Sequence, residues 1–131
     1  MPLVRVSMKK GRSAEERRAI ADCVHTALVE AIGIPVDDRF QVVTEYGGDS
    51  VGSELIYDPH YLGIERTDGI VFVQVFLRKG RTVEAKQAFY LRLTDLLSER
   101  VKIRAEDVMI TLSENDVADW SFGNGVAQYV K

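Results

Sequence analysis

Alternating apolar and polar positions mark two strands, and each predicted strand leads into an amphipathic helix. Residues 3–8 alternate between apolar and polar side chains, and residues 70–77 are almost wholly apolar; both patterns are typical of β-strands. Ser13 and Thr82 are favourable N-cap residues, and Ser13 with Glu16 has the spacing of a capping box. Helices are therefore predicted to begin at both caps.

Each predicted helix has one apolar face. In the first helix this face has five members: Ile20, Val24, Ala27, Leu28 and Ala31. The positions 69 residues later are apolar at all but the last: Phe89, Leu93, Leu96, Leu97 and Arg100. Gly33 with Pro35 predicts the end of the first helix, and residues 40–45 and 108–112 are predicted to form closing strands.

The same shift relates two halves of the chain. Lys10–Ser13 recurs as Lys79–Thr82, a shift of 79 minus 10, and Glu45 then falls on Glu114. We therefore expect one domain made of two strand–helix–strand repeats. The expected boundaries are repeats at about 1–46 and 70–115, a long connection over 47–69, and a C-terminal tail over 116–131.

Two such repeats predict an α+β fold in which a four-stranded sheet carries two helices on one face. The strand over 70–77 is apolar on both sides, so the face without helices needs a cover, and another subunit is the expected one.

Composition narrows the function. The chain has 131 residues, 46% hydrophobic and 28% charged, as expected of an ordinary globular protein. A net charge of −3 without a basic run argues against nucleic-acid binding. No membrane-spanning segment or signal peptide is evident, and Cys23 is the only cysteine, so we expect a soluble cytoplasmic protein without disulfides.

Pro2 is the first candidate for chemistry, because removal of Met1 would expose its secondary amine at the start of a strand. An α-amino group titrates near about pH 8, so modest burial could make it a neutral base at physiological pH. An ordinary terminus is the alternative, since many proteins begin with Met-Pro.

Pro2 opening a strand, followed by Gly11–Ser13 opening a helix, resembles the 4-oxalocrotonate tautomerase family of the tautomerase superfamily. Four longer motifs resemble its fused relatives, most closely malonate semialdehyde decarboxylase: Gly33–Pro35, Asp38–Gln41, Glu114–Asp116 and Asp119–Gly123. The resemblance implies a homotrimer of duplicated chains with a catalytic amino-terminal proline.

The resemblance also implies roles for Arg78 and Arg81, which would bind a substrate carboxylate. Their spacing is that of cis-3-chloroacrylate dehalogenase and is wider than in the decarboxylase. Residue type alone favours a solvated loop here.

Asp38 matches the aspartate beside the proline of the decarboxylase, where it could orient the amine and raise its pKa. Its repeat partner Asp107 instead favours a role in turn formation. Trp120 and Phe122 either anchor the tail or, as the resemblance implies, form a wall of the site. Phe40 replaces an arginine of the simple tautomerase, so arginine catalysis from that position is not expected.

No metal or cofactor is implied. His25 and His60 lack partners at metal-ligand spacing and are predicted to lie on the surface. Cys23 has no base placed to activate it and is predicted to be a partly buried helix residue.

These features predict keto–enol proton transfer by Pro2 on a small 2-oxo acid held by Arg78 and Arg81, with Asp38 positioning Pro2. One alternative uses a cationic Pro2 for decarboxylation of malonate semialdehyde, hydration or dehalogenation. An alternative of another class is a trimeric binding protein that kept the fold and lost the chemistry.

Overall fold

The computed structural model describes residues 1–47 and 52–131. Part of the expected connection over 47–69, residues 48–51, therefore lies outside the described residues. The main elements along the chain are β1 (Pro2–Lys9), α1 (Ala14–Ala27), β2 (Gln41–Tyr46), β3 (Val71–Arg78), α2 (Val83–Val101) and β4 (Val108–Asn115). Four short helical turns accompany them: η1 (Leu28–Ile32), η2 (Tyr61–Gly63), η3 (Ala105–Asp107) and η4 (Val117–Asp119).

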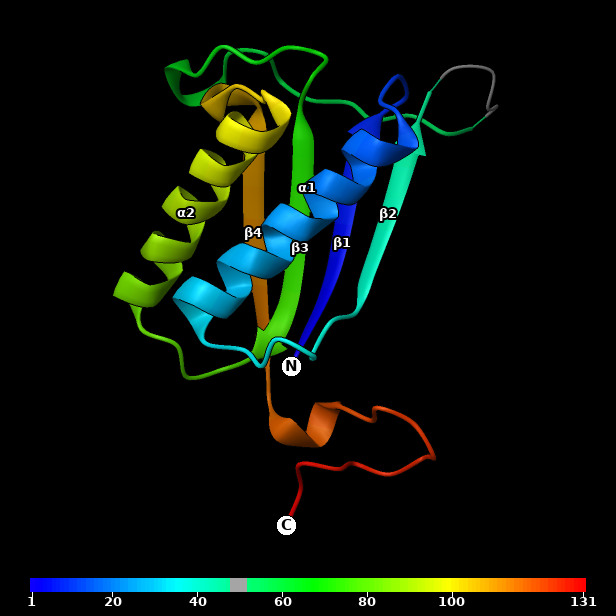
Figure 1. Ribbon diagram of the computed structural model, residues 1–131, viewed down its shortest axis with the longest axis vertical. Coiled ribbons are helices and arrows are strands. Elements are labelled where there is room, and N and C mark those ends of the chain that lie inside the picture. Colours follow the sequence, from blue (N-terminus) through cyan, green and yellow to red (C-terminus); the bar gives the residue numbers. More distant parts are fainter. Residues whose placement is uncertain (48–51) are drawn as a thin grey trace.

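The four strands form one sheet in the order β2-β1-β3-β4. β1 pairs with β2, and β3 pairs with β4, in parallel, whereas the central pair β1 and β3 is antiparallel. Both helices cover the same face of this sheet (Figure 1). The predicted α+β fold is confirmed.

The hydrophobic core lies between the helices and the sheet. Alternate residues of the central strands face the helices and are buried: Val4, Val6, Met8, Val71, Val73, Val75 and Leu77. They pack with the predicted helix faces, of which Ile20, Val24, Phe89 and Leu93 are completely buried. Within the described residues, neither helix is both long and apolar enough to span a bilayer.

The helix boundaries follow the capping signals. Ser13 and Glu16 form the predicted capping box, and the Thr82 hydroxyl accepts a hydrogen bond from the Ala85 amide at 3.1 Å. The first helix continues beyond α1 through the π-helical turn η1. It ends at Gly33, which has a φ of 81° that a glycine adopts without strain.

One contact recurs in both halves of the chain. Arg17 of α1 pairs with Glu45 of β2 at 3.2 Å, and 69 residues later Lys86 of α2 pairs with Glu114 of β4 at 2.8 Å. The Glu114 carboxylate also accepts a hydrogen bond from the Gly80 amide; Lys86 and this amide hold the pKa of Glu114 below its usual value. The second carboxylate thus ties β4 to the loop that precedes α2.

The face of the sheet opposite the helices carries half-exposed apolar side chains. Leu3, Val42 and Met109 are 38%, 48% and 52% exposed, and they alternate with residues that face the helices. Arg5 lies among them on β1, with Gln74 as its cross-strand neighbour. The chain alone therefore leaves an apolar sheet face open to solvent.

The prediction that His25 lies on the surface is wrong. Its side chain is buried, and its Nε2 lies 2.7 Å from the carbonyl oxygen of Val36, because the loop after the first helix folds back over α1. His60 is exposed, as predicted. Cys23 is fully buried rather than partly buried, and its burial raises the pKa of the thiol, so the reactive thiolate is disfavoured.

Candidate active site

The amino terminus lies at the end of the sheet where β1 begins and β3 ends (Figure 1). Pro2 is buried and pairs with Leu77 in the antiparallel register. Met1 precedes it and is only 6% exposed. The Met1 ammonium donates a hydrogen bond to Oδ2 of Asp38 at 2.5 Å. The chain terminus is therefore held in place rather than free in solvent.

Asp38 reaches the amino terminus because of the loop between the first helix and β2. The Asp38 amide donates to the carbonyl of Pro35 at 3.1 Å, which closes a turn, and the carbonyl of Phe40 accepts from the Val4 amide at 3.0 Å. Its Oδ1 is buried and has no hydrogen-bond partner among the described residues. This carboxylate oxygen can accept a further proton donor without breaking a contact.

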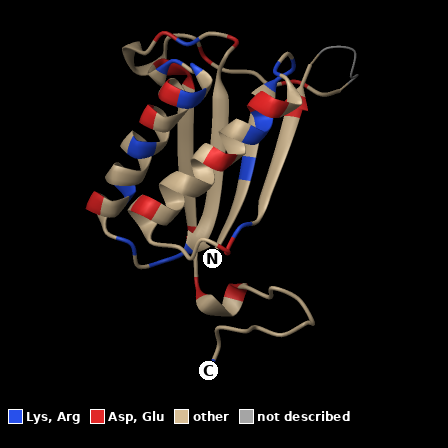
Figure 2. Ribbon diagram, viewed as in Figure 1, with Lys and Arg blue, Asp and Glu red and all other residues tan. Residues whose placement is uncertain are grey.

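Arg78 and Arg81 lie together at the same end of the sheet. Arg78, the last residue of β3, is exposed, while Arg81 is half-buried and donates to the Arg78 carbonyl at 2.8 Å. Burial and then the like charge of Arg78 lower the pKa of Arg81, although a guanidinium stays charged at physiological pH. Figure 2 shows basic residues in this loop and acidic residues near the amino terminus. The loop is thus suited to an anion.

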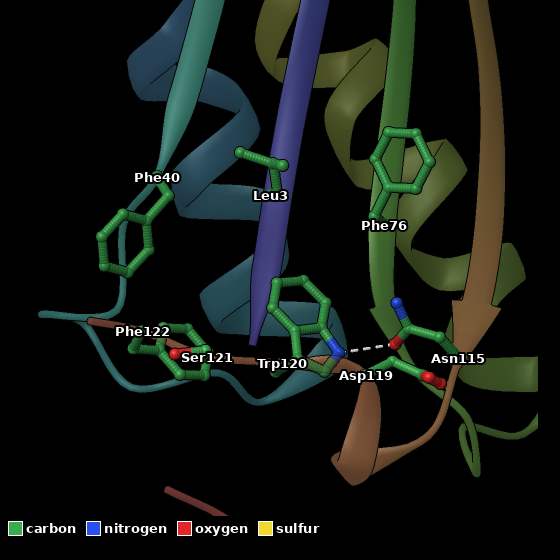
Figure 3. Close-up of a pocket in the computed structure, with 8 residues that line it drawn as sticks. All are labelled: Leu3, Phe40, Phe76, Asn115, Asp119, Trp120, Ser121 and Phe122. Atoms are coloured by element: carbon green, nitrogen blue, oxygen red, sulfur yellow. Dashed lines mark hydrogen bonds between the residues drawn. The ribbon is translucent and has the colours of Figure 1, made fainter. Parts of the chain in front are cut away.

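A pocket of about 410 Å³ lies between this end of the sheet and the C-terminal tail (Figure 3). Its lining comes from the sheet and from the segment after β4: Leu3, Phe40, Phe76, Asn115, Asp119, Trp120, Ser121 and Phe122. The Trp120 and Phe122 rings are stacked, with centroids 5.5 Å apart and an angle of 8° between the planes. A cavity of this size and apolar character suits a small molecule.

Asn115 connects this pocket to the arginine loop. The Trp120 Nε1 donates to Oδ1 of Asn115 at 2.6 Å, and the Lys79 amide donates to the Asn115 carbonyl oxygen at 2.7 Å. The tail then turns through η4, where Asp116 and Asp119 form a reciprocal capping box. The aromatic wall therefore has a defined position relative to the end of β4.

The structure brings the residues singled out from the sequence into two groups. Trp120 and Phe122 form one wall of the pocket, while Asp38 holds the amino terminus that precedes Pro2. Pro2, Asp38 and the two arginines do not line this pocket. Among the described residues, no cluster of His, Cys, Asp and Glu side chains could hold a metal ion.

Several pocket residues were not recognised from the sequence. Leu3, Phe76 and Asn115 point away from the helix-covered face, which the alternation of their strands could have indicated. Phe40 was noted only for the arginine it replaces, yet its ring lies 5.8 Å from that of Phe122. No sequence pattern announces that the tail turns back beneath the sheet.

Comparisons with known proteins agree with this architecture. A family model described as "Tautomerase enzyme" matches residues 38–123, and a second with the same description matches residues 2–54. The probable tautomerase YusQ of Bacillus subtilis (strain 168) is 38% identical over 131 residues, which cover 100% of both chains. The probable tautomerase YrdN of the same organism is 36% identical over 99% of this chain and 97% of its own.

Solved structures extend the comparison. FG41 malonate semialdehyde decarboxylase inhibited by 3-bromopropiolate is 42% identical with a TM-score of 0.88, over 97% of this chain and 93% of that one. The wild-type fused 4-OT Q0, a symmetric trimer, is 25% identical with a TM-score of 0.71, over 95% and 94%. The resemblance inferred from the sequence is confirmed: the chain belongs to the tautomerase family of enzymes.

Proposed function

We propose that this enzyme, once Met1 is removed, uses the secondary amine of Pro2 as the acid–base group in keto–enol proton transfer on a small 2-oxo acid. The observation that carries the proposal is the contact between the amino terminus and the largely buried Asp38 carboxylate. Consecutive Cα atoms are about 3.8 Å apart, so the terminus created at Pro2 stays near Asp38. Because Met1 is 6% exposed, its removal also opens a sheltered space beside the new amine.

The other residues have distinct roles in this proposal. Arg78 and Arg81 bind the substrate carboxylate, and Trp120 and Phe122 shield the reacting atoms from water. In ketonisation, the Pro2 amine accepts the proton of the enol hydroxyl and the resulting ammonium delivers a proton to the adjacent carbon. The double bond moves from carbon–carbon to carbon–oxygen, so no cofactor is consumed.

A second candidate function is decarboxylation of malonate semialdehyde, or hydration of an activated double bond, with Pro2 acting as a cation. The position of Asp38 favours it, because a carboxylate near an amine stabilises the ammonium form. The 42% identity with a malonate semialdehyde decarboxylase supports the same alternative. Family membership speaks against the third possibility, a binding protein without activity.

A proton-NMR screen tests the proposal and separates the two chemistries. Purified protein without Met1 is incubated with phenylenolpyruvate, 2-hydroxymuconate and malonate semialdehyde. Ketonisation of either enol supports tautomerisation, and release of carbon dioxide with acetaldehyde supports the decarboxylase. Failure to convert any of the three would contradict both candidates.

Asp38→Asn is expected to lower the pKa of the Pro2 amine, because the substitution removes the charge that stabilises the ammonium form. If the neutral amine is the active base, the alkaline plateau of the pH–rate profile then extends to lower pH in the variant. Titration of the ¹⁵N-labelled Pro2 nitrogen by NMR in both proteins measures the shift directly. An unchanged or higher pKa in the variant would contradict the role assigned to Asp38.

We also propose that the chain is a single domain of two repeats and assembles as a homotrimer. The matching Arg17–Glu45 and Lys86–Glu114 pairs support the repeats, and the apolar face around Leu3 supports the assembly. Fused 4-OT proteins form symmetric and asymmetric trimers. Light scattering after size exclusion should give three times the 14.7 kDa mass of one chain; a soluble monomer would contradict the assembly.

A further inference from the structure

Asn115 ends β4 and lies at the rim of the aromatic pocket, between the arginine loop and Trp120 (Figure 3). The two ends of its side-chain amide can be told apart by chemistry. The indole nitrogen of Trp120 is only a donor, so the atom it contacts at 2.6 Å must be the amide oxygen. The Nδ2 group, with its two N–H donors, is therefore directed away from Trp120.

This Nδ2 group donates to no acceptor within residues 1–47 and 52–131. Most of the side chains that share the pocket with it are apolar: Leu3, Phe40, Phe76, Trp120 and Phe122. A polar N–H group facing apolar side chains gains strongly from an acceptor, because little competing water is ordered around it. The pocket therefore presents a fixed neutral donor to whatever occupies it.

The position of this donor relative to the arginines is set by the sheet. Asn115 and Arg78 are Cα partners in the β3–β4 register, and neighbouring strands lie about 4.8 Å apart. The Lys79 amide, between the two arginines, is bonded to the Asn115 carbonyl oxygen. A ligand whose carboxylate contacts the arginine loop would thus extend its next polar atom toward Nδ2 of Asn115.

We propose that Asn115 is a substrate-binding residue that donates a hydrogen bond to the 2-oxo oxygen, so that the enzyme distinguishes 2-oxo acids from simple carboxylates. This inference rests on the proposed function, because it takes the arginine pair as the carboxylate site. The bond to Trp120 holds the amide in the donating orientation. As the oxygen gains negative charge during enolisation, the same N–H stabilises it further.

The competing explanation is that Asn115 acts only by orienting Trp120. Two substitutions separate the explanations: Asn115→Ala removes donor and acceptor together, whereas Asn115→Asp keeps an acceptor for the indole and loses the donor. Trp120 is the only tryptophan in the sequence, so near-UV circular dichroism and fluorescence report on this site directly.

The experiment measures dissociation constants of 2-oxobutanoate and butanoate by quenching of Trp120 fluorescence, using protein without Met1. The readout is the ratio of the two constants, since added charge in Asn115→Asp weakens both anions alike. We expect the preference for the 2-oxo acid to fall about three- to tenfold in both variants, the usual scale of one neutral hydrogen bond. Asn115→Asp should retain the Trp120 circular dichroism signal.

A preference that survives in Asn115→Asp, or equal weakening of both ligands in Asn115→Ala, would overturn the inference and leave the proposed function standing. Wild-type protein that binds neither acid would overturn the proposed function and this inference with it.

Discussion

Replacement of Pro2 with alanine is expected to lower kcat/KM by about a hundredfold or more, the usual contribution of a positioned acid–base group. Alanine is also small enough to permit removal of Met1, so the variant still has a free terminus beside Asp38. What it loses is the secondary amine and the rigid ring that starts β1. Steady-state kinetics with the substrate identified by NMR measures the effect.

Folding damage is excluded by a separate measurement on the same variant. Pro2 is the first residue of β1 and contributes no backbone N–H to the sheet, so Pro2→Ala should leave the thermal unfolding midpoint close to that of the wild type. A variant that unfolds normally and retains activity within about threefold of the wild type would contradict the role of Pro2.

Arg81→Ala is expected to weaken the use of carboxylate substrates by about ten- to a hundredfold, which corresponds to the ~1.5 to 3 kcal/mol of a hydrogen bond to a charged group. The half-buried guanidinium donates to the Arg78 carbonyl, so its loss also loosens the loop that presents Arg78. Kinetics should show the loss mainly for substrates that carry a carboxylate, with a much smaller loss for uncharged ketone analogues.

Arg12→Ala provides the matched control. Arg12 is the repeat counterpart of Arg81, 69 residues earlier, but it lies at the opposite end of the sheet and donates to the Gly69 carbonyl at 2.6 Å. Its replacement should leave kcat/KM for carboxylate substrates unchanged. Similar losses for Arg12→Ala and Arg81→Ala, or equal losses for charged and uncharged substrates, would contradict carboxylate binding by Arg81.

The fold could be predicted from the sequence because its signals are local. Alternation identified the strands, and the caps at Ser13 and Thr82 marked both helix starts. His25 could not be placed, because its burial depends on a loop that returns over α1 and supplies the Val36 carbonyl. The pocket could not be assembled either, since Leu3 and Trp120 meet only when the tail turns back after β4.

Asp38 and Asp107 show where repeat logic reaches its limit. The two residues are equivalent in the sequence, and the turn role suggested by Asp107 competed with a site role for Asp38. Asp107 is buried and accepts hydrogen bonds from the Thr67 amide at 2.7 Å and hydroxyl at 2.6 Å. Asp38 instead contacts the amino terminus. Equivalent carboxylates thus differ because only one lies beside a chain end.

The most direct test of a catalytic Pro2 compares one protein before and after its amino terminus is exposed. The chain is prepared with a cleavable extension ahead of Pro2, and kcat/KM is measured before and after a cleavage that mass spectrometry shows to end at Pro2. An amide nitrogen has no basic lone pair, so the extended form should be at least about a hundredfold less active, and cleavage should restore activity. Equal activity of the extended and cleaved forms would contradict the claim that the Pro2 amine carries out the chemistry.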